Sequence, residues 1–425
     1  MARYGTPRLH AYATLTVLGV LVALASGRPE FAALAAPFAL LLTVGLAVSS
    51  RPRFTIETRL SANRVIQGDT VTLLATVSSP DGVTRLDLSP VMPAGVEPAL
   101  PLVGTVRVTP GEPVELEFPL RAARWGTPQL GVFRLRASDR FGLVRYDSSA
   151  GRAEPVRVLP DAGTLQALIH PAHTEIFAGE VVSRHRGDGI EFSDVRAFSI
   201  GDRVRDINWR ATARAGELFV NQRVADRNAD VVLFVDTFNE LRPAPGMQSS
   251  LDFAVSATAS VAAAYLRRRD RVGLVGWGGY LQWVALGMGQ AALYRIVDVL
   301  LEARVVRSDA WRGVRILPAG VLPPGALVIA LTPLLDPRMT NAIFDLRARG
   351  SDVAVIELDP VAFQTPGRRP EEQLAFRLWR LSRLRVRRRL EDRGVIVAQW
   401  DGGRELEEVV RELEDRRRQY WRRSG

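Results

Sequence analysis

Val231-Val232-Leu233-Phe234-Val235-Asp236 decides the fold of the second half of this 425-residue chain. Five apolar residues in a row, followed by an acid, are typical of a strand that is buried on both faces of a parallel sheet. Similar apolar runs recur at Val272–Val275, Leu327–Leu331 and Val353–Leu358. Because patterns of helical period separate these runs, the alternation predicts parallel strands joined by helices.

The remaining elements complete a predicted α/β domain over residues 231–425. We expect further strands and helices, in chain order, at Leu251–Arg269 (helix), Leu281–Leu286 (strand), Leu293–Arg304 (helix), Pro337–Arg349 (helix), Glu371–Arg393 (helix), Val395–Ala398 (strand) and from Glu405 onward (helix). This order predicts a doubly wound, mainly parallel sheet, in which ligands bind beyond the carboxyl ends of the strands. Asp236, Thr332 and Asp336 are therefore the candidate site residues of this domain.

The helix predicted at Glu371–Arg393 is strongly basic. Its leucines recur at spacings of three and four residues and share one face: Leu374, Leu378, Leu381 and Leu384. We expect this leucine face to pack on the sheet. The arginines would then lie in water or face an anionic lipid leaflet: Arg377, Arg380, Arg383, Arg387 and Arg388.

Residues 161–230 form a polar connector in which arginines and acids are closely interleaved. The residues singled out there are Gly189, Glu191, Phe192, Arg196, Gly201, Asp202, Arg205, Asp206, Asn208, Trp209, Arg210, Thr212 and Arg214. Arginine binds carboxylates in bidentate geometry and stacks on indole rings. One interpretation is therefore a brace of ion pairs with Trp209 packed among the arginines, its members being Glu191, Arg196, Asp202, Asp206 and Arg210. A second interpretation is a surface for a protein partner, and a third is a catalytic site.

Residues 51–160 have the pattern of β structure. Short alternating runs at Thr70–Val77, Val103–Val108, Val114–Leu120 and Val132–Ala137 are separated by turns rich in Pro and Gly. This spacing predicts a small antiparallel sandwich. Since the stretch contains no cluster of His or carboxylates, we expect a spacer or interaction module.

The first fifty residues hold two uncharged stretches, 9–26 and 31–50, separated by Arg28-Pro29-Glu30. Each is roughly 20 residues long, the length needed to cross about 30 Å of hydrocarbon. They predict a two-helix transmembrane hairpin over residues 1–50. Arginines flank both of its outer ends, namely Arg3, Arg8, Arg51 and Arg53. The positive-inside rule therefore predicts an inner-membrane protein whose termini and soluble body are cytoplasmic.

Composition excludes several classes of protein. The chain has no Cys, and it contains no Lys, so all 56 basic residues are arginine. Disulfide scaffolds, thiolate metal sites, P-loops and Schiff-base enzymes each need one of the missing residues. Only 4 His are present, and His170 and His173 flank a proline, which predicts a loop. The arginines behind the net charge of +10 are spread over the chain and mixed with acids, so we expect no nucleic-acid binding. We also expect no cofactor.

Over essentially its whole length, the chain resembles the bacterial membrane protein family that carries "domain of unknown function 58". The resemblance lies in Gly189-Ile190-Glu191-Phe192, Gly201-Asp202, Arg205-Asp206-Ile207-Asn208-Trp209 and Thr212-Ala213-Arg214, and Asp139-Arg140-Phe141-Gly142-Leu143 also agrees with it. The resemblance implies a von Willebrand factor A-like fold for residues 231–425. It also implies a role in assembling or activating other proteins, beside a MoxR-type AAA+ ATPase.

A von Willebrand A domain binds Mg²⁺ through Asp-x-Ser-x-Ser after its first strand, together with a Thr and an Asp from later loops. Oxygen ligands around an octahedral cation explain that pattern. In this chain Phe238 and Glu240 stand at the two Ser positions, and Pro333 follows Thr332. Asp236 is the only secure remnant of such a site, so we expect no bound metal.

The function that these features predict is that of a membrane-anchored, cytosol-facing interaction or assembly protein that is not an enzyme. Its expected partners are membrane lipid through residues 9–26 and 31–50, a MoxR-type AAA+ ATPase and an unknown client protein. Two alternatives stay open. One is an acid- or metal-dependent hydrolase at the carboxyl edge of the sheet, and the other is an arginine-rich nucleic-acid binder.

Overall fold

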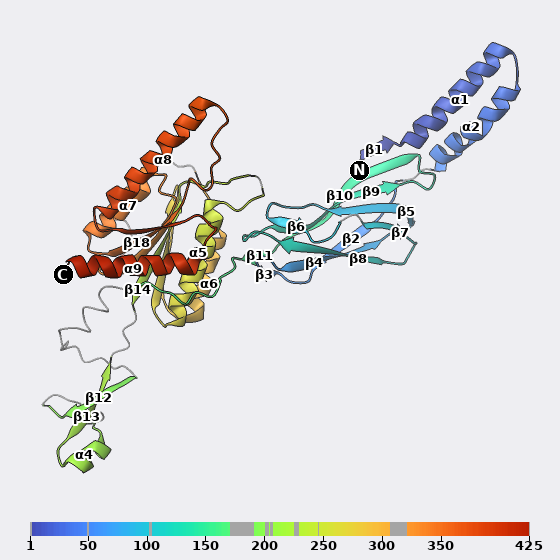
Figure 1. Ribbon diagram of the computed structural model, residues 1–425. Coiled ribbons are helices and arrows are strands. Elements are labelled where there is room, and N and C mark those ends of the chain that lie inside the picture. The colour runs from blue at the N-terminus through green and yellow to red at the C-terminus, as the bar shows by residue number, and fades with distance from the viewer. Residues whose placement is uncertain are drawn as a thin grey trace. The chain divides into compact units, whose positions relative to one another are not determined.

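The computed structural model describes residues 2–48, 51–101, 104–170, 191–199, 204, 207–224, 229–244, 246–306 and 321–424. The chain divides into two compact units, Met1–Asp161 and Ala162–Gly425. Figure 1 shows the elements of both units.

Unit 1 contains two apolar helices, α1 (Pro7–Ser26) and α2 (Glu30–Val48). Each is long and apolar enough to cross a membrane, with mean hydropathies of 1.8 and 2.3. The helices pack closely, because a Cβ added at Gly19 would lie 2.6 Å from the Cβ of Ala35. The rings of Tyr12 and Phe38 also meet, with centroids 5.7 Å apart. The two predicted helices are present, and their crossing of a membrane stays a prediction.

Two antiparallel sheets follow and share one core. The strand orders are β1-β10-β9-β5-β7 and β2-β4-β8-β6. The strands are β1 (Ala2–Gly5), β2 (Thr55–Leu60), β4 (Thr70–Ser78), β5 (Val83–Pro90), β6 (Val96–Pro98), β7 (Gly104–Val108), β8 (Val114–Ala122), β9 (Gln129–Ser138) and β10 (Val144–Pro155), with a parallel pair of β3 (Arg64–Ile66) and β11 (Arg157–Leu159) beside them. Phe118 of one sheet and Phe133 of the other meet in this core, with ring centroids 5.1 Å apart.

The residues before α1 belong to the sheet rather than to the apolar helices. Strand β1 pairs antiparallel with β10. Thr6, the N-cap of α1, donates its hydroxyl to the carbonyl of Gly142 at 2.6 Å and its backbone N–H to the carbonyl of Leu143 at 3.0 Å. Near the end of α2, a Cβ added at Gly45 would clash with the side chain of Leu143. The outer ends of both helices are therefore held at one loop of the sandwich.

Unit 2 contains a six-stranded sheet in the order β16-β15-β14-β17-β18-β19. Its strands are β14 (Asp230–Thr237), β15 (Arg271–Gly278), β16 (Leu281–Gly287), β17 (Leu327–Thr332), β18 (Asp352–Leu358) and β19 (Ile396–Trp400). All neighbouring pairs are parallel except β15 and β16, so β16 is an antiparallel edge strand. The strand order reverses between β14 and β17. The predicted α/β alternation is present, with element ends that differ by a few residues.

Helices cover both faces of this sheet (Figure 1). They are α5 (Ser250–Arg267), α6 (Gly289–Leu301), α7 (Pro337–Ala348), α8 (Pro370–Glu391) and α9 (Leu406–Ser424). Helix α5 begins at a capping box formed by Ser249 and Asp252, and it contacts four strands and α6. Helices α7 and α8 share the opposite core with Val232 and Phe234.

A two-stranded antiparallel sheet lies within the segment that is predicted to be a polar connector. Strand β12 (Glu191–Ala197) pairs antiparallel with β13 (Phe219–Val224), and the short helix α4 (Trp209–Ala215) lies between them in sequence. These elements are not predicted from the sequence, because the dense charge pattern there hides the period of two that normally reveals a strand.

Candidate functional site

Asp236 and Thr332 lie side by side at the carboxyl ends of β14 and β17, the two strands between which the strand order reverses. The hydroxyl of Thr332 donates to Oδ2 of Asp236 at 2.6 Å, and the backbone N–H of Phe238 donates to Oδ1 at 2.9 Å. Asp236 is 2% exposed. Burial raises its pKa to about 7, against the lowering effect of these two hydrogen bonds. Doubly wound sheets bind ligands at this position, so it is the first candidate site.

Asp336 lies at the start of α7 and is bound by an arginine of the same helix. Arg338 donates from Nε to Oδ1 and from Nη2 to Oδ2 of Asp336, both at 2.9 Å. The same guanidinium lies over the ring of Phe238, with its Cζ 4.2 Å from the centroid. Burial acts to raise the pKa of Asp336, but the hydrogen bonds from Arg338 and Asn239 outweigh it and lower the pKa. A cation supplied by the chain itself therefore lies at this edge.

Glu357 is a third acid at the same edge, and sequence reasoning missed it. It lies opposite Thr332 on the neighbouring strand β18 and is 1% exposed. Arg387 of α8 donates from Nε to its Oε2 at 2.6 Å. Burial raises the pKa of Glu357, and the Arg387 guanidinium acts against that rise. The available signal was an acid near the end of the apolar run Val353–Leu358.

These contacts leave a donor set that does not fit an octahedral cation. Both oxygens of Asp236 already accept hydrogen bonds, and the Thr332 hydroxyl is one of the donors. Phe238 presents a ring where a hydroxyl ligand would stand, and Glu240 pairs with Arg242 at 2.6 Å. Among the described residues, no group of three or more His, Asp or Glu side chains is placed to hold a metal ion. We therefore derive no metal chemistry for this edge.

Two residues of the polar connector have clear structural roles. The side chain of Asn208 caps α4 by accepting from the backbone N–H of Ala211 at 3.0 Å. The hydroxyl of Thr212 accepts from the backbone N–H of Phe219 at 3.0 Å, which ties α4 to β13. The predicted site residues that lie outside the described part of the chain are Gly189, Gly201, Asp202, Arg205 and Asp206, and the side chains of Glu191 and Phe192 are not described either.

Trp209 differs from its prediction, because its side chain is at the surface. It is 65% exposed rather than packed at the centre of a brace. It is the first residue of α4. Arg196 donates to the carbonyl of Ala197 at 3.0 Å, and Arg210 and Arg214 are exposed. The predicted ion-pair network depends on acids outside the described residues and stays a prediction.

The predicted orientation of the basic helix is wrong. The leucines expected on the sheet are exposed: Leu374 by 58%, Leu378 by 60%, Leu381 by 52% and Leu384 by 39%. Two of the arginines expected in water instead face the sheet edge, since Arg387 binds Glu357 and Arg383 donates to the carbonyl of Leu334 at 2.9 Å. The buried carboxylate of Glu357 needs the positive charge of Arg387 as its partner, and the carbonyl of Leu334 accepts from Arg383. These two contacts fix the rotation of α8 about its axis.

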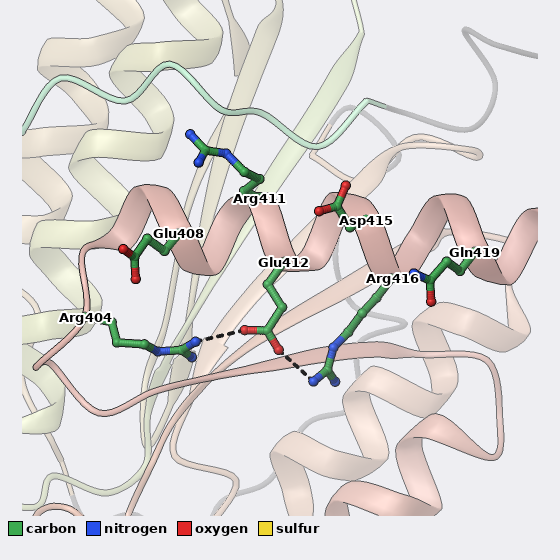
Figure 2. Close-up of a pocket in the computed structure, with 7 residues that line it drawn as sticks. All are labelled: Arg404, Glu408, Arg411, Glu412, Asp415, Arg416 and Gln419. Carbon is green, nitrogen blue, oxygen red and sulfur yellow. Dashed lines mark hydrogen bonds and ion pairs between the residues drawn. The ribbon is translucent and has the colours of Figure 1, made fainter.

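A shallow pocket along α9 is lined by charged side chains of both signs (Figure 2). The lining residues are Arg404, Glu408, Arg411, Glu412, Asp415, Arg416 and Gln419. Glu412 accepts from Arg404 at 3.1 Å and pairs with Arg416 at 2.6 Å, as the dashed lines in Figure 2 show. Because the charges of Arg404, Glu412 and Arg416 already pair with one another, we do not treat this pocket as a functional site.

Comparison with known proteins finds a family that is similar to part of the chain. The family described as "Protein of unknown function DUF58" matches residues 194–367. Relatives include the uncharacterized proteins Rv1480 of Mycobacterium tuberculosis (strain ATCC 25618 / H37Rv) and Mb1516 of Mycobacterium bovis (strain ATCC BAA-935 / AF2122/97), each 26% identical over 208 residues. The match covers 48% of this chain and 58% of each relative. The resemblance seen in the sequence is thus confirmed over residues 194–367.

Solved structures give weaker likenesses. Native alpha-2-macroglobulin from Escherichia coli, from domain MG7 to the C-terminus, is 19% identical, with 28% of this chain and 19% of that chain covered and a TM-score of 0.23. The CARDB domain of the PF1109 protein from Pyrococcus furiosus is 17% identical, with coverages of 24% and 96% and a TM-score of 0.15. At these TM-scores neither likeness supports an argument about fold or function.

Proposed function

We propose that this chain is a membrane-anchored interaction or assembly protein rather than an enzyme. The observation that carries the proposal is the pairing of acids and arginines at the carboxyl edge of the six-stranded sheet. Arg338 binds Asp336, Arg387 binds Glu357, and hydrogen bonds engage both oxygens of Asp236. A hydrolase would need an acid or a metal with a position left open for substrate or water. The paired acids therefore support a binding function, in which unit 2 presents a fixed surface to another protein.

The partner surface in this proposal includes Trp209. Tryptophan and arginine are enriched among the residues that dominate binding energy at protein interfaces. Trp209 is 65% exposed, and Val204 and Leu218 of the same segment are also exposed, by 69% and 43%. These side chains belong to the segment that resembles the family signature. We propose a MoxR-type AAA+ ATPase as the partner, because the family resemblance implies one, and a von Willebrand factor A-like identity for the α/β unit.

The anchor in this proposal is the pair α1 and α2, with the termini and the soluble body in the cytoplasm. The arginines that flank the pair support this orientation. The hydrogen bonds of β1 to β10 support one part of this proposal, namely that the N-terminus and the sandwich lie on the same side of any membrane that the pair crosses.

Site-directed crosslinking of the full-length protein in native membranes tests the proposal. Because the chain has no Cys, a Trp209→Cys variant can carry a crosslinker at that position alone. The matched control is Tyr294→Cys on α6, whose parent side chain is 52% exposed. We expect mass spectrometry to identify a MoxR-type ATPase at least fivefold enriched at position 209 over position 294. Equal recovery at both positions, or no ATPase at position 209, would contradict the proposed partner surface.

A further inference from the structure

Helix α8 presents an apolar stripe to the outside of unit 2. Leu374, Leu378 and Leu381 recur at spacings of four and three residues and are 58%, 60% and 52% exposed. We propose that this leucine stripe, defined by these three residues, inserts into the headgroup region of an anionic lipid bilayer. The inference rests on the proposed anchoring by α1 and α2, and it adds a second membrane contact made by the soluble body.

The rotation of α8 that exposes the stripe is fixed by contacts on its other face. Leu390 is 0% exposed in the core below the helix, and Val386 packs against the same core. On the same inward side, Arg387 binds the buried carboxylate of Glu357 at 2.6 Å. Turning the leucines toward the sheet would remove Arg387 from Glu357 and leave a buried, unpaired charge. The outward position of the leucine stripe is therefore a stable feature of the fold.

The charges around the leucine stripe select the kind of surface that covers it. With 100° between successive residues, Arg377, Arg385 and Arg388 lie on the same outward arc as the leucines, and all three are exposed. The ion pairs that α8 forms with other described residues involve Arg387 and Glu391 and none of these three arginines. An arginine-rich helix with leucines on the same exposed surface is typical of an interfacial membrane helix, because long arginine side chains reach lipid phosphates while the leucines enter the apolar layer. An anionic bilayer supplies both the negative charge and the apolar layer.

Depth-dependent fluorescence quenching in nanodiscs tests this inference on the full chain. Single Cys variants of the Cys-free protein are labelled with an environment-sensitive fluorophore at Leu378, at Leu40 of α2 as the anchor control, and at Tyr294 of α6 as the solvent control. The nanodiscs contain either phosphatidylcholine alone or phosphatidylcholine with phosphatidylglycerol, and a brominated lipid is the quencher. In the anionic discs we expect quenching at least twofold stronger at Leu378 than at Tyr294, and a loss of that difference in neutral discs.

A charge variant and a proximity measurement separate the alternatives. Replacing Arg377, Arg380, Arg385 and Arg388 with Gln should reduce quenching at Leu378 at least twofold and leave Leu40 unchanged. If Leu378 is quenched no more than Tyr294 while Leu40 is quenched, the inference about α8 is wrong and the anchor stands. If Leu40 itself is not quenched, the proposed anchor fails. Energy transfer between labels at Leu378 of two copies, without lipid quenching, would make the stripe a dimer contact and overturn the inference.

Discussion

The carboxylate of Glu414 on α9 accepts two hydrogen bonds from His170, one from its backbone N–H at 3.1 Å and one from ring Nδ1 at 3.2 Å. Two turns earlier on the same helix, Glu407 accepts from the backbone N–H groups of Gln166 and Ala167. On α5, the hydroxyl of Tyr265 donates to the carbonyl of Ile169 at 2.6 Å. The segment through which the chain enters unit 2 is therefore held by side chains of two helices.

Replacing Glu414 with Gln should loosen this entry segment. Burial acts to raise the pKa of Glu414, but hydrogen bonds from His170 and Arg418 outweigh it and hold the pKa at about 2. The ionised carboxylate therefore stabilises the fold above its ordinary pKa, and this contribution is lost as the pH falls from about 4.5 toward 2. At neutral pH, Glu414→Gln should increase hydrogen exchange at the His170 amide at least tenfold.

The matched control for this change is Glu412→Gln on the same helix. Glu412 pairs with Arg404 and Arg416, both about half exposed, so its loss should leave exchange at His170 unchanged. If Glu414→Gln and Glu412→Gln gave the same exchange rate at His170 as the wild-type protein, Glu414 would not be the residue that holds the segment.

Arg417 forms a buried ion pair whose loss should be costly. Its side chain is 1% exposed, and Nη2 lies 2.8 Å from Oδ2 of Asp352. Arg417→Met should reduce the free energy of unfolding by about 3–5 kcal/mol, since it leaves a buried carboxylate without its cation. The neighbouring Arg418→Met removes a 56% exposed partner of Glu414 and should cost about 0–1 kcal/mol. Denaturant unfolding of the two variants checks the difference, and equal costs would contradict this assignment.

The sequence predicted the α/β alternation because buried parallel strands are continuous apolar runs that need no tertiary information to detect. It also placed Asp236 and Thr332 at one sheet edge, since the carboxyl ends of neighbouring strands meet there. It could not give the rotation of α8. Leu374 and its companions have the spacing of a buried face, and the preference for the opposite face comes from Glu357, which needs Arg387 as its partner. Contacts between residues distant in sequence decided this, as they did for the pairing of β1 with β10.

Asp236 should make the stability of unit 2 fall as the pH rises from about 4 to about 7. Burial raises its pKa to about 7, so in this window the folded state holds a proton that the unfolded state has released. The contribution is therefore full below pH 4 and lost by pH 7, at about 1.4 kcal/mol per pH unit within the window. Asp236→Asn should lack this slope. Denaturant unfolding of both proteins at a series of pH values checks it, and parallel pH profiles would contradict the prediction.

Thr332→Val provides a second variant at the same pair. The Thr332 hydroxyl lowers the pKa of Asp236 by donating to its carboxylate, so its removal should raise that pKa further. The upper limit of the pH window should then move above 7 in Thr332→Val and should not move in a Thr→Val variant of the exposed surface, such as Thr55→Val in the sandwich.

The N-terminus and the sandwich should lie on the same side of the membrane. Hydrogen bonds, rather than charge, set this constraint: β1 is paired with β10, and the Thr6 hydroxyl donates to the carbonyl of Gly142 at 2.6 Å. Two crossings by α1 and α2 satisfy this constraint, and a single crossing would pull β1 away from its sheet.

Single Cys variants at Ala2, Ser61 and Arg28 can be labelled with a membrane-impermeant maleimide in intact spheroplasts and in inverted vesicles. We expect Ala2 and Ser61 to react only in inverted vesicles and Arg28, in the turn, only in spheroplasts. Labelling of Ala2 and Ser61 from opposite sides would show that the strand pairing does not survive in the membrane.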